Sequence, residues 1–325
     1  MLRAIPSRPV EPAIEMYKLV VSDLDGTLLG PDHRLGDYTR GVLGRLRAAG
    51  TDLVLASGRH FMDIRGIARL LAAQGASDGG RQPGGNRVTA AGGGTKLDRA
   101  EDGAPTEAEH GYLISCNGAA VNAADGRLVQ ATCLGQEPLG FLLHDPLFRS
   151  VHTNVFLADA WLVEQADPSL LRFHRDSGFC YRVVDFAALD APAVLKVYFS
   201  GAHDHLLDLE AEILTRYGET LGTTFSLPQT LEVMAAGVSK GAALARLLPD
   251  LGLTPADVVC IGDGLNDLEM LRLVADGGGL ALLMDNADDR LHAALPDLPR
   301  IGSHADEAVA SYLERMLANG TLRPA

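Results

Sequence analysis

Cysteine, tryptophan and positive charge are all scarce in this chain. Its 325 residues include four cysteines, which lie far apart without a Cys-x-x-Cys pair: Cys116, Cys133, Cys180 and Cys260. This spacing predicts neither a zinc site nor a disulfide framework and favours reduced thiols. The 28 basic residues are outnumbered by 42 acidic ones, which gives a net charge of -14. Nucleic acids and anionic membranes need a basic surface, so we expect neither as a partner.

Long apolar runs are also missing. No stretch reaches the length of a membrane-spanning helix, and the first residues lack an apolar signal core, so we expect a cytoplasmic protein. With 47% hydrophobic residues the chain can bury a large core. Its length exceeds what one core usually supports, which predicts two domains. We expect a monomer or a weak homo-oligomer.

The most informative stretch is residues 19–27, an apolar run that stops at two acids, a glycine and a threonine. Side chains alternate along a strand, so Asp23 and Asp25 project to the same side, and Gly26 permits a turn immediately afterwards. Two neighbouring carboxylates repel unless a cation or a proton lies between them, and a hard cation such as Mg2+ suits them best. Taken alone, the same residues also fit an ordinary Asp-Gly turn.

The same design recurs along the chain. Four apolar runs end in small polar residues, and helical patterns separate or follow most of them: residues 20–23, 53–59, 113–118 and 258–264. Alternating strands and helices predict an α/β fold with a parallel, doubly wound, Rossmann-like sheet. Ligands in such sheets bind beyond the carboxyl ends of the strands, so all four polar endings are expected to meet at one edge.

Two segments are predicted to lie outside the packed fold. Residues 1–15 carry three prolines and no periodic pattern, which indicates a loose extension. Residues 75–110 are rich in glycine and almost free of large apolar side chains, so they bury too little surface to offset their ordering entropy. We interpret them as a disordered insertion. The glycines at 92–94 follow no strand and open no helix, which disfavours a phosphate-binding loop.

The second polar ending leaves two alternatives open. After a helix predicted over residues 38–49 and capped by Gly50, a strand leads to Ser57, Gly58 and Arg59. The Ser57 hydroxyl and nearby backbone N–H groups fit a phosphate oxygen, but Ser57 fits a helix cap equally well. Arg59 fits either a substrate contact or an ion pair with a surface acid.

The middle of the chain changes pattern. Residues 122–229 mix strand-like runs (151–163, 181–186 and 194–199) with helical runs (138–144 and 203–217). Strands next to one another with helices on one face predict an α+β cap, inserted into a core of residues 16–121 and 230–325. Four polar or aromatic cap residues either face the substrate or are packing or rim residues of the cap: His152, Asn154, Trp161 and Tyr198.

Charged residues return near the last two polar segments. Lys240 stands at a predicted helix start, where the dipole disfavours a cation, so it either meets an anion or extends into water. Asp263 ends a strand, and Asn266 and Asp267 lie in the first turn of the next helix. Glu269 lies in the same turn, where the helix dipole already accounts for an acid.

Together these residues specify phosphoryl transfer, which needs positioning and charge neutralisation more than covalent chemistry. Asp23 is the candidate nucleophile for an aspartyl-phosphate intermediate. Asp25 fits the acid that protonates the leaving oxygen and the base that then activates water. Lys240 and Mg2+ would stabilise the developing charge.

Four segments carry a family resemblance: DLDGT (23–27), LASGR (55–59), GVSKG (237–241) and GDGLND (262–267). In this order and spacing they resemble the four motifs of the haloacid dehalogenase superfamily of phosphatases. Asn117-Gly118-Ala119 and the cap position resemble its Cof-type branch (subclass IIB), especially the bacterial pyridoxal phosphate and sugar phosphatases. The resemblance covers about residues 16–320 apart from the insertion.

The resemblance implies a role for each matching residue. The metal ligands would be Asp23, Asp25 through its backbone carbonyl, Asp263 and Asp267. The residues around the phosphate and substrate would be Thr27, Ser57, Gly58, Arg59, Asn117, Asn266 and Lys240. One departure is the run 283–287, Leu-Met-Asp-Asn-Ala, which adds Asp285 near the active edge where the family has Met-Gly-Asn-Ala.

The substrates implied are small phosphorylated metabolites, namely pyridoxal 5'-phosphate and hexose phosphates. Three alternatives remain. A receiver domain also forms an aspartyl phosphate but needs neither Asp25 nor a cap. A non-catalytic metabolite-binding protein would be free to lose either acid. A phosphomutase of the same superfamily is the nearest enzymatic alternative.

Overall fold

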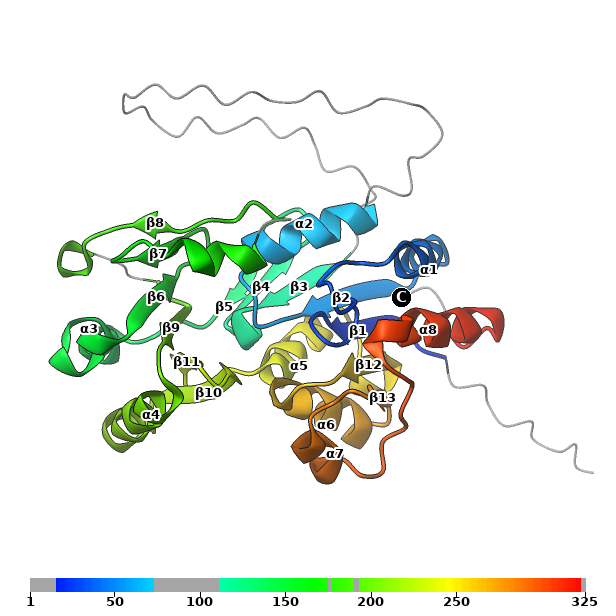
Figure 1. Ribbon diagram of the computed structural model, residues 1–325. Helices are drawn as coiled ribbons and strands as arrows, with labels where there is room; N and C mark the ends of the chain where they lie inside the picture. Colours follow the sequence, from blue (N-terminus) through cyan, green and yellow to red (C-terminus); the bar gives the residue numbers. More distant parts are fainter. Residues whose placement is uncertain (1–15, 73–110, 175–176, 190–192, 323–325) are drawn as a thin grey trace, which may run out of the picture.

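The computed structural model describes residues 16–72, 111–174, 177–189 and 193–322. The extension predicted for residues 1–15 and the insertion predicted for residues 75–110 lie outside these described residues. Within them the chain forms two bodies, each built around its own sheet: an α/β core and, as predicted, an α+β cap whose sheet is mostly antiparallel (Figure 1).

The larger body contains a seven-stranded sheet in the order β13-β12-β1-β2-β3-β4-β5. Its strands are β1 Leu19–Asp23, β2 Asp52–Ala56, β3 Tyr112–Ser115, β4 Ala120–Ala123, β5 Leu128–Ala131, β12 Val258–Gly262 and β13 Leu280–Leu283. The five strands from β13 to β3 run parallel, and β4 and β5 extend the edge antiparallel. The predicted parallel core is confirmed.

Helices cover both faces of this sheet (Figure 1). One face packs against α1 Asp37–Ala48, α2 Phe61–Ala72 and α8 Ala308–Ala318, the other against α5 Lys240–Asp250, α6 Leu268–Asp276 and α7 Asp289–Ala294. Strand β1 is buried throughout because Val20 faces the first group and Leu19 and Val21 face the second. Gly50, at φ +82°, follows α1 as predicted.

The smaller body, which we call the cap, contains a six-stranded sheet in the order β10-β11-β9-β6-β7-β8. Its elements are α3 Gln136–His144, β6 His152–Phe156, β7 Trp161–Val163, β8 Arg182–Val183, β9 Lys196–Ser200, α4 His203–Tyr217, β10 Leu221–Leu227 and β11 Thr230–Ala235. Both helices pack on one face, where Val155, Val197 and Val233 meet them. The opposite face of the cap sheet turns toward the core.

Both boundaries of the cap differ from the predicted ones, because the strands at each boundary belong to the other sheet. Residues 122–131, predicted to begin the cap, complete β4 and β5 of the core sheet, because β4 pairs with β3 and β5 folds back on β4. Residues 230–235, predicted to return to the core, form β11 of the cap. The apolar pattern of this segment does mark a buried strand, but Leu231 and Val233 pack in the core of the cap.

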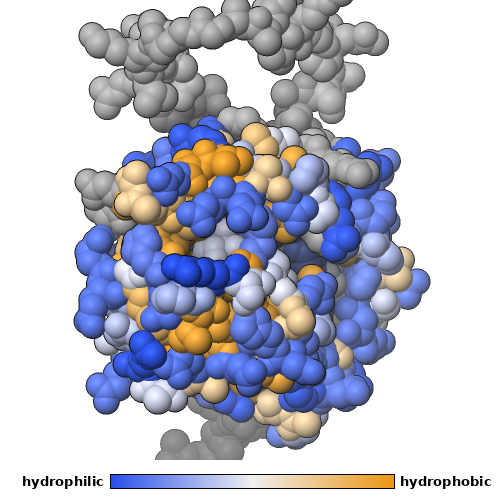
Figure 2. Space-filling view, turned by 60° about the vertical axis from the view of Figure 1, so that its left-hand side comes forward, coloured by the Kyte–Doolittle hydropathy of each residue, from blue (hydrophilic) through white to orange (hydrophobic). Residues whose placement is uncertain are grey.

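The surface on the cap side is mostly hydrophilic, with smaller apolar areas between the polar side chains (Figure 2). Large apolar side chains that are exposed in the cap are Leu147, Val183, Leu207, Leu214 and Leu227. Over the described residues, no helix is both long enough and apolar enough to cross a membrane.

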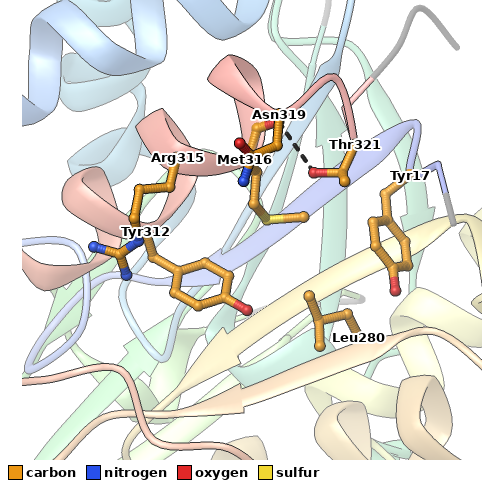
Figure 3. A pocket seen from close by; sticks show the side chains of 7 residues that line it. All are labelled: Tyr17, Leu280, Tyr312, Arg315, Met316, Asn319 and Thr321. Atoms are coloured by element: carbon orange, nitrogen blue, oxygen red, sulfur yellow. Dashed lines mark hydrogen bonds between the residues drawn. The ribbon is translucent and has the colours of Figure 1, made fainter. Parts of the chain in front are cut away.

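A cavity of about 570 Å³ lies between α8 and the first residues of the sheet strands (Figure 3). Its lining residues are Tyr17, Leu280, Tyr312, Arg315, Met316, Asn319 and Thr321. Tyr17 precedes β1 and Leu280 begins β13, so the cavity lies at the amino edge of the sheet. The polar strand endings lie at the opposite edge.

Candidate active site

Four polar strand endings converge at the carboxyl edge of the core sheet, as predicted. Strands β12, β1, β2 and β3 are neighbours and parallel. They therefore deliver Asp263, Asp23, Ser57 and Asn117 to one edge. Helix α5 adds Lys240 from its first position, where Ser239 caps the helix by accepting a hydrogen bond from the Ala242 N–H at 3.0 Å.

Lys240 meets anions rather than water. Its side chain is fully buried, and its Nζ donates to Oδ1 of Asp23 and Oδ1 of Asp267, each at 2.6 Å. Burial alone would lower the pKa of Lys240, but the two carboxylates raise it above the usual value. The ammonium therefore stays charged, and these anions remove the penalty of a cation at a helix start.

Three carboxylates form a compact cluster at this edge. One oxygen from each of Asp23, Asp263 and Asp267 lies within 4.8 Å of the others. Burial, together with the neighbouring negative charges, raises the pKa of Asp23 well above its usual value despite Lys240. Burial and the charges of Asp267 and Asp25 raise the pKa of Asp263 to about 7. A divalent cation with oxygen ligands fits this set, because it would offset the repulsion.

The loops around the cluster are tightly fixed. Oδ2 of Asp267 accepts hydrogen bonds from the N–H groups of Asp263 and Gly264, at 2.9 and 2.8 Å. Thr27 Oγ1 donates to Oδ1 of Asp263 at 2.6 Å. Gly26 has a φ of +82°, and a Cβ there would lie 2.2 Å from Asp263 Oδ2, so only glycine allows this approach.

Arg59 pairs with the predicted acid/base residue. Its Nε donates to Oδ2 of Asp25 at 2.7 Å, and a second nitrogen donates to Oδ1, so the pair is bidentate. His33 Nδ1 lies 3.0 Å from the same Oδ1. Burial alone would raise the pKa of Asp25, but the hydrogen bonds and charge of Arg59, helped by His33, hold it below its usual value.

Arg59 also reaches a residue that sequence reasoning missed. Its Nη1 lies 3.4 Å from Oδ2 of Asp63, a buried acid in the first turn of α2. His174 and Ser177 of the cap contact Asp63 as well. Thus Arg59 joins two acids of the site instead of a surface acid. The sequence did contain a signal for this contact: Arg59 and Asp63 are four residues apart, a spacing at which opposite charges often pair at a helix.

Ser57 does not cap α2. Its Oγ accepts a hydrogen bond from the Arg59 N–H at 3.1 Å, whereas α2 begins only at Phe61. His60 Nδ1 accepts from the Met62 N–H at 3.1 Å and so takes the cap position. Burial lowers the pKa of His60 to about 4, so its ring is neutral at physiological pH.

Asn117 connects two loops and the cap. Its Oδ1 accepts from Asn266 Nδ2 at 3.1 Å, and its Nδ2 donates to Oε2 of Glu232 at 2.6 Å. Asn117 has a φ of +54°, which asparagine tolerates better than most residues. Gly58 must be small here because a Cβ would lie 2.9 Å from Asn117 Oδ1.

Two of the four candidate cap residues are packing residues. Trp161 is fully buried among aromatic rings, and its Nε1 donates to Oδ1 of buried Asn154 at 2.9 Å. His152 Nε2 lies 2.8 Å from the Gln165 carbonyl oxygen, near the cap surface. Tyr198 lies on the core-facing side of the cap sheet, and burial raises the pKa of its hydroxyl.

Residues 283–287, where the sequence departs from the family pattern, contact the loop that follows β1 through Asn286. Asn286 Nδ2 donates to the Gly26 carbonyl at 2.8 Å, and its Oδ1 accepts from the His304 N–H at 3.0 Å. The side chain of Asp285 is exposed. Glu269 is also exposed in the first turn of α6, which agrees with the structural interpretation of that acid.

A profile of the haloacid dehalogenase-like hydrolases matches residues 20–77 and 98–313. The chain belongs to the haloacid dehalogenase-like hydrolase family. Two curated relatives are each named HMP-PP phosphatase. The one from Cronobacter sakazakii is 35% identical over 302 residues, covering 93% of this chain and 96% of its own. The one from Escherichia coli is 33% identical over 302 residues, which again cover 93% of this chain and 96% of its own.

Solved structures show the same fold. A haloacid dehalogenase-like hydrolase from Bacteroides thetaiotaomicron superposes with a TM-score of 0.73 at 24% identity, covering 92% of this chain and 99% of its own. The family predicted from the motifs is confirmed, and the protein is a phosphatase. At the finer level these curated relatives are named HMP-PP phosphatase, not pyridoxal phosphate or sugar phosphatase.

Proposed function

We propose that the protein is a Mg2+-dependent phosphatase that hydrolyses small phosphorylated metabolites through a phosphoryl group carried on Asp23. The arrangement of Asp23 carries the proposal. Lys240 holds one of its carboxylate oxygens at 2.6 Å, and the acids of the cluster surround it. A carboxylate fixed in this way is oriented for attack, which is the requirement of nucleophilic catalysis.

In the first step, the free oxygen of Asp23 forms a bond to phosphorus as the bond from phosphorus to the leaving oxygen breaks. Asp25 gives the leaving oxygen a proton. In the second step Asp25 takes a proton from water as the water oxygen bonds to phosphorus and the bond from phosphorus to Asp23 breaks, which releases inorganic phosphate and restores the Asp23 carboxylate. Arg59 holds Asp25 ionised, which suits the second step. The first step requires Arg59 to release Asp25, and the substrate phosphate is the anion that would attract it. The freed Asp25 carboxylate must then take up a proton from water before it can give one to the leaving oxygen.

The remaining groups neutralise charge and orient the phosphate. Asp23, Asp263 and Asp267 would hold the cation, with the Asp25 carbonyl expected to complete the set. When bound, Mg2+ supplies charge neutralisation to the phosphoryl oxygens. Ser57 and Lys240 are expected to donate hydrogen bonds to those oxygens. The Thr27 hydroxyl, which donates to Asp263 in this structure, is expected to turn its proton to the phosphate when substrate binds.

The proposed substrate class follows from the cap and the relatives. The cap sheet packs over the carboxyl edge, through an apolar cluster in which Phe156, Trp161 and Leu195 meet Cys116 and Ala120. Because the cap covers the carboxyl edge in this way, the site is expected to admit small molecules more readily than a phosphate on a protein. Given the names of the relatives, HMP-PP is the first candidate, followed by pyridoxal 5'-phosphate and hexose phosphates.

A phosphate-release screen with Mg2+ tests this proposal. It should include HMP-PP, pyridoxal 5'-phosphate, hexose phosphates, nucleotides and a phosphopeptide, ranked by kcat/KM. We expect a small metabolite to rank first and free phosphate to accumulate. A phosphopeptide in first place would contradict the substrate class. Transfer of the phosphoryl group within the substrate, without free phosphate, would identify a phosphomutase instead.

A further inference from the structure

A buried ion pair of the cap lies against the catalytic edge. Lys196 begins β9 and Glu232 lies in the neighbouring strand β11, with Lys196 Nζ 3.0 Å from Oε1 of Glu232. Lys196 is 2% exposed and Glu232 is 6% exposed. Lysine and glutamate are almost never buried to this extent unless paired. Such a pair is usually no more stabilising than apolar residues of similar volume, so stability alone does not account for it.

Lys196 reaches across to the loop that carries Ser57. Its Nζ donates to the Gly58 carbonyl oxygen at 2.8 Å. That carbonyl belongs to the peptide group whose N–H, on Arg59, donates to Ser57 Oγ at 3.1 Å. One rigid peptide plane therefore connects the cap lysine to the hydroxyl that faces the phosphate. A charged donor at one end strengthens the hydrogen bond at the other.

Glu232 reaches across to the second loop. Its Oε2 accepts from Asn117 Nδ2 at 2.6 Å, while Asn117 Oδ1 accepts from Asn266. The carboxylate thus fixes which end of the Asn117 amide faces each neighbour. Both oxygens of Glu232 are engaged as acceptors, one by Lys196 and one by Asn117.

We propose that Lys196 and Glu232 are positioning residues: from the cap, they orient Ser57 and Asn117 of the core for phosphate binding. This inference rests on the proposed function, which assigns Ser57 to the phosphate, and on the place beside phosphate and substrate that the family resemblance implies for Asn117. It predicts that the ion pair matters for phosphate affinity and turnover more than for folding.

The test replaces the pair by apolar residues of similar size, Lys196→Met with Glu232→Leu, which leaves no unpaired charge. The matched control is Glu212→Gln with Arg216→Met, an exposed ion pair on α4 of the same cap. Melting temperature, kcat and KM for p-nitrophenyl phosphate with Mg2+, and inhibition by inorganic phosphate are measured for each protein.

We expect the apolar pair variant to melt close to the wild type but to lose about 10- to 100-fold in kcat/KM, with weaker inhibition by phosphate, because misplaced binding groups reduce turnover steeply. The control should keep its kcat/KM. Wild-type kcat/KM in the pair variant would overturn the proposal.

If the pair variant does not fold, Glu232→Gln decides the question. A glutamine cannot accept from both Lys196 and Asn117, because its amide nitrogen must face one of the two donors. A folded Glu232→Gln protein with unchanged kcat/KM would overturn the proposal, and a loss of about 10-fold supports it. If the wild type hydrolyses no phosphate ester, the proposed function is wrong, and the positioning role needs a test that does not depend on turnover. Calorimetric affinity for inorganic phosphate, compared between wild type and variant, then tests the positioning role, and equal affinities would refute it.

Discussion

Replacing Asp263 by asparagine should stabilise the metal-free protein while removing its Mg2+-dependent activity. The Asp263 carboxyl lies beside Asp23 and Asp267. Burial, with the charges of Asp267 and Asp25, raises its pKa to about 7. An asparagine has nearly the same shape and still accepts the hydrogen bond from Thr27. It carries no charge, so it relieves the repulsion but loses the metal.

The magnitude follows from the pKa difference between the folded and unfolded states. The pKa of Asp263 is about 7 in the folded protein against an ordinary value of 3.8, a difference of about three pH units. At about 1.36 kcal/mol per unit, its ionisation costs up to about 4 kcal/mol above pH 7. Because the folded pKa is raised, this penalty is absent below about pH 4, grows between pH 4 and 7, and stays constant above pH 7. The metal-free wild type should therefore lose stability over this window, and Asp263→Asn should not.

The assay is denaturant unfolding of both proteins from pH 4 to 8, with a chelator and then with excess Mg2+. Mg2+ at about 100 times its dissociation constant should add about 2.7 kcal/mol to the wild type and nothing to the variant. Asp257→Asn is the control of opposite sign. Hydrogen bonds from Thr254 and Lys18 lower the pKa of Asp257 to about 2, so this variant should lose stability at neutral pH. An Asp263→Asn protein that is less stable than the wild type at pH 8 without metal would refute the reasoning.

Asp23→Asn should abolish turnover of any phosphate ester and keep the fold, because an amide lacks the nucleophilic charge; measurable kcat in purified protein would contradict this. Lys240→Met should lose activity and about 3 to 5 kcal/mol of stability at neutral pH, since it leaves Asp23 and Asp267 buried without their cation. That stability should return as the pH falls and the carboxylates protonate, which unfolding at pH 5 and 8 would measure. Deleting residues 78–108 should preserve folding and hydrolysis, because a segment so poor in large apolar side chains is expected to bury little surface; a precipitated or inactive deletion protein would contradict this.

Local sequence patterns predicted the part of the site that strand order determines. Each of Asp23, Ser57 and Asp263 follows an apolar run, and parallel strands place their carboxyl ends together, so the convergence needed no knowledge of distant contacts. Lys240 was correctly predicted at a helix start, which is also a local feature of the sequence.

The missed features depend on contacts between segments far apart in the chain. Strand β11 has the same apolar pattern as a core strand, and only its pairing with β9 assigns it to the cap. Lys196 and Glu232 are 36 residues apart and meet only through that pairing. The bond between Arg59 and Asp25 likewise depends on how two loops approach, which side-chain types alone do not determine.

The central claim is that Asp23 carries the phosphoryl group, and chemical trapping tests it most directly. Asp25→Asn protein is mixed with p-nitrophenyl phosphate and Mg2+, because this ester needs no acid to leave whereas the second step lacks its base. The mixture is quenched, reduced with borohydride and analysed by peptide mass spectrometry. The account predicts a burst of p-nitrophenol and reduction at Asp23 alone. Reduction at another residue, or a burst with Asp23 unmodified, would contradict it.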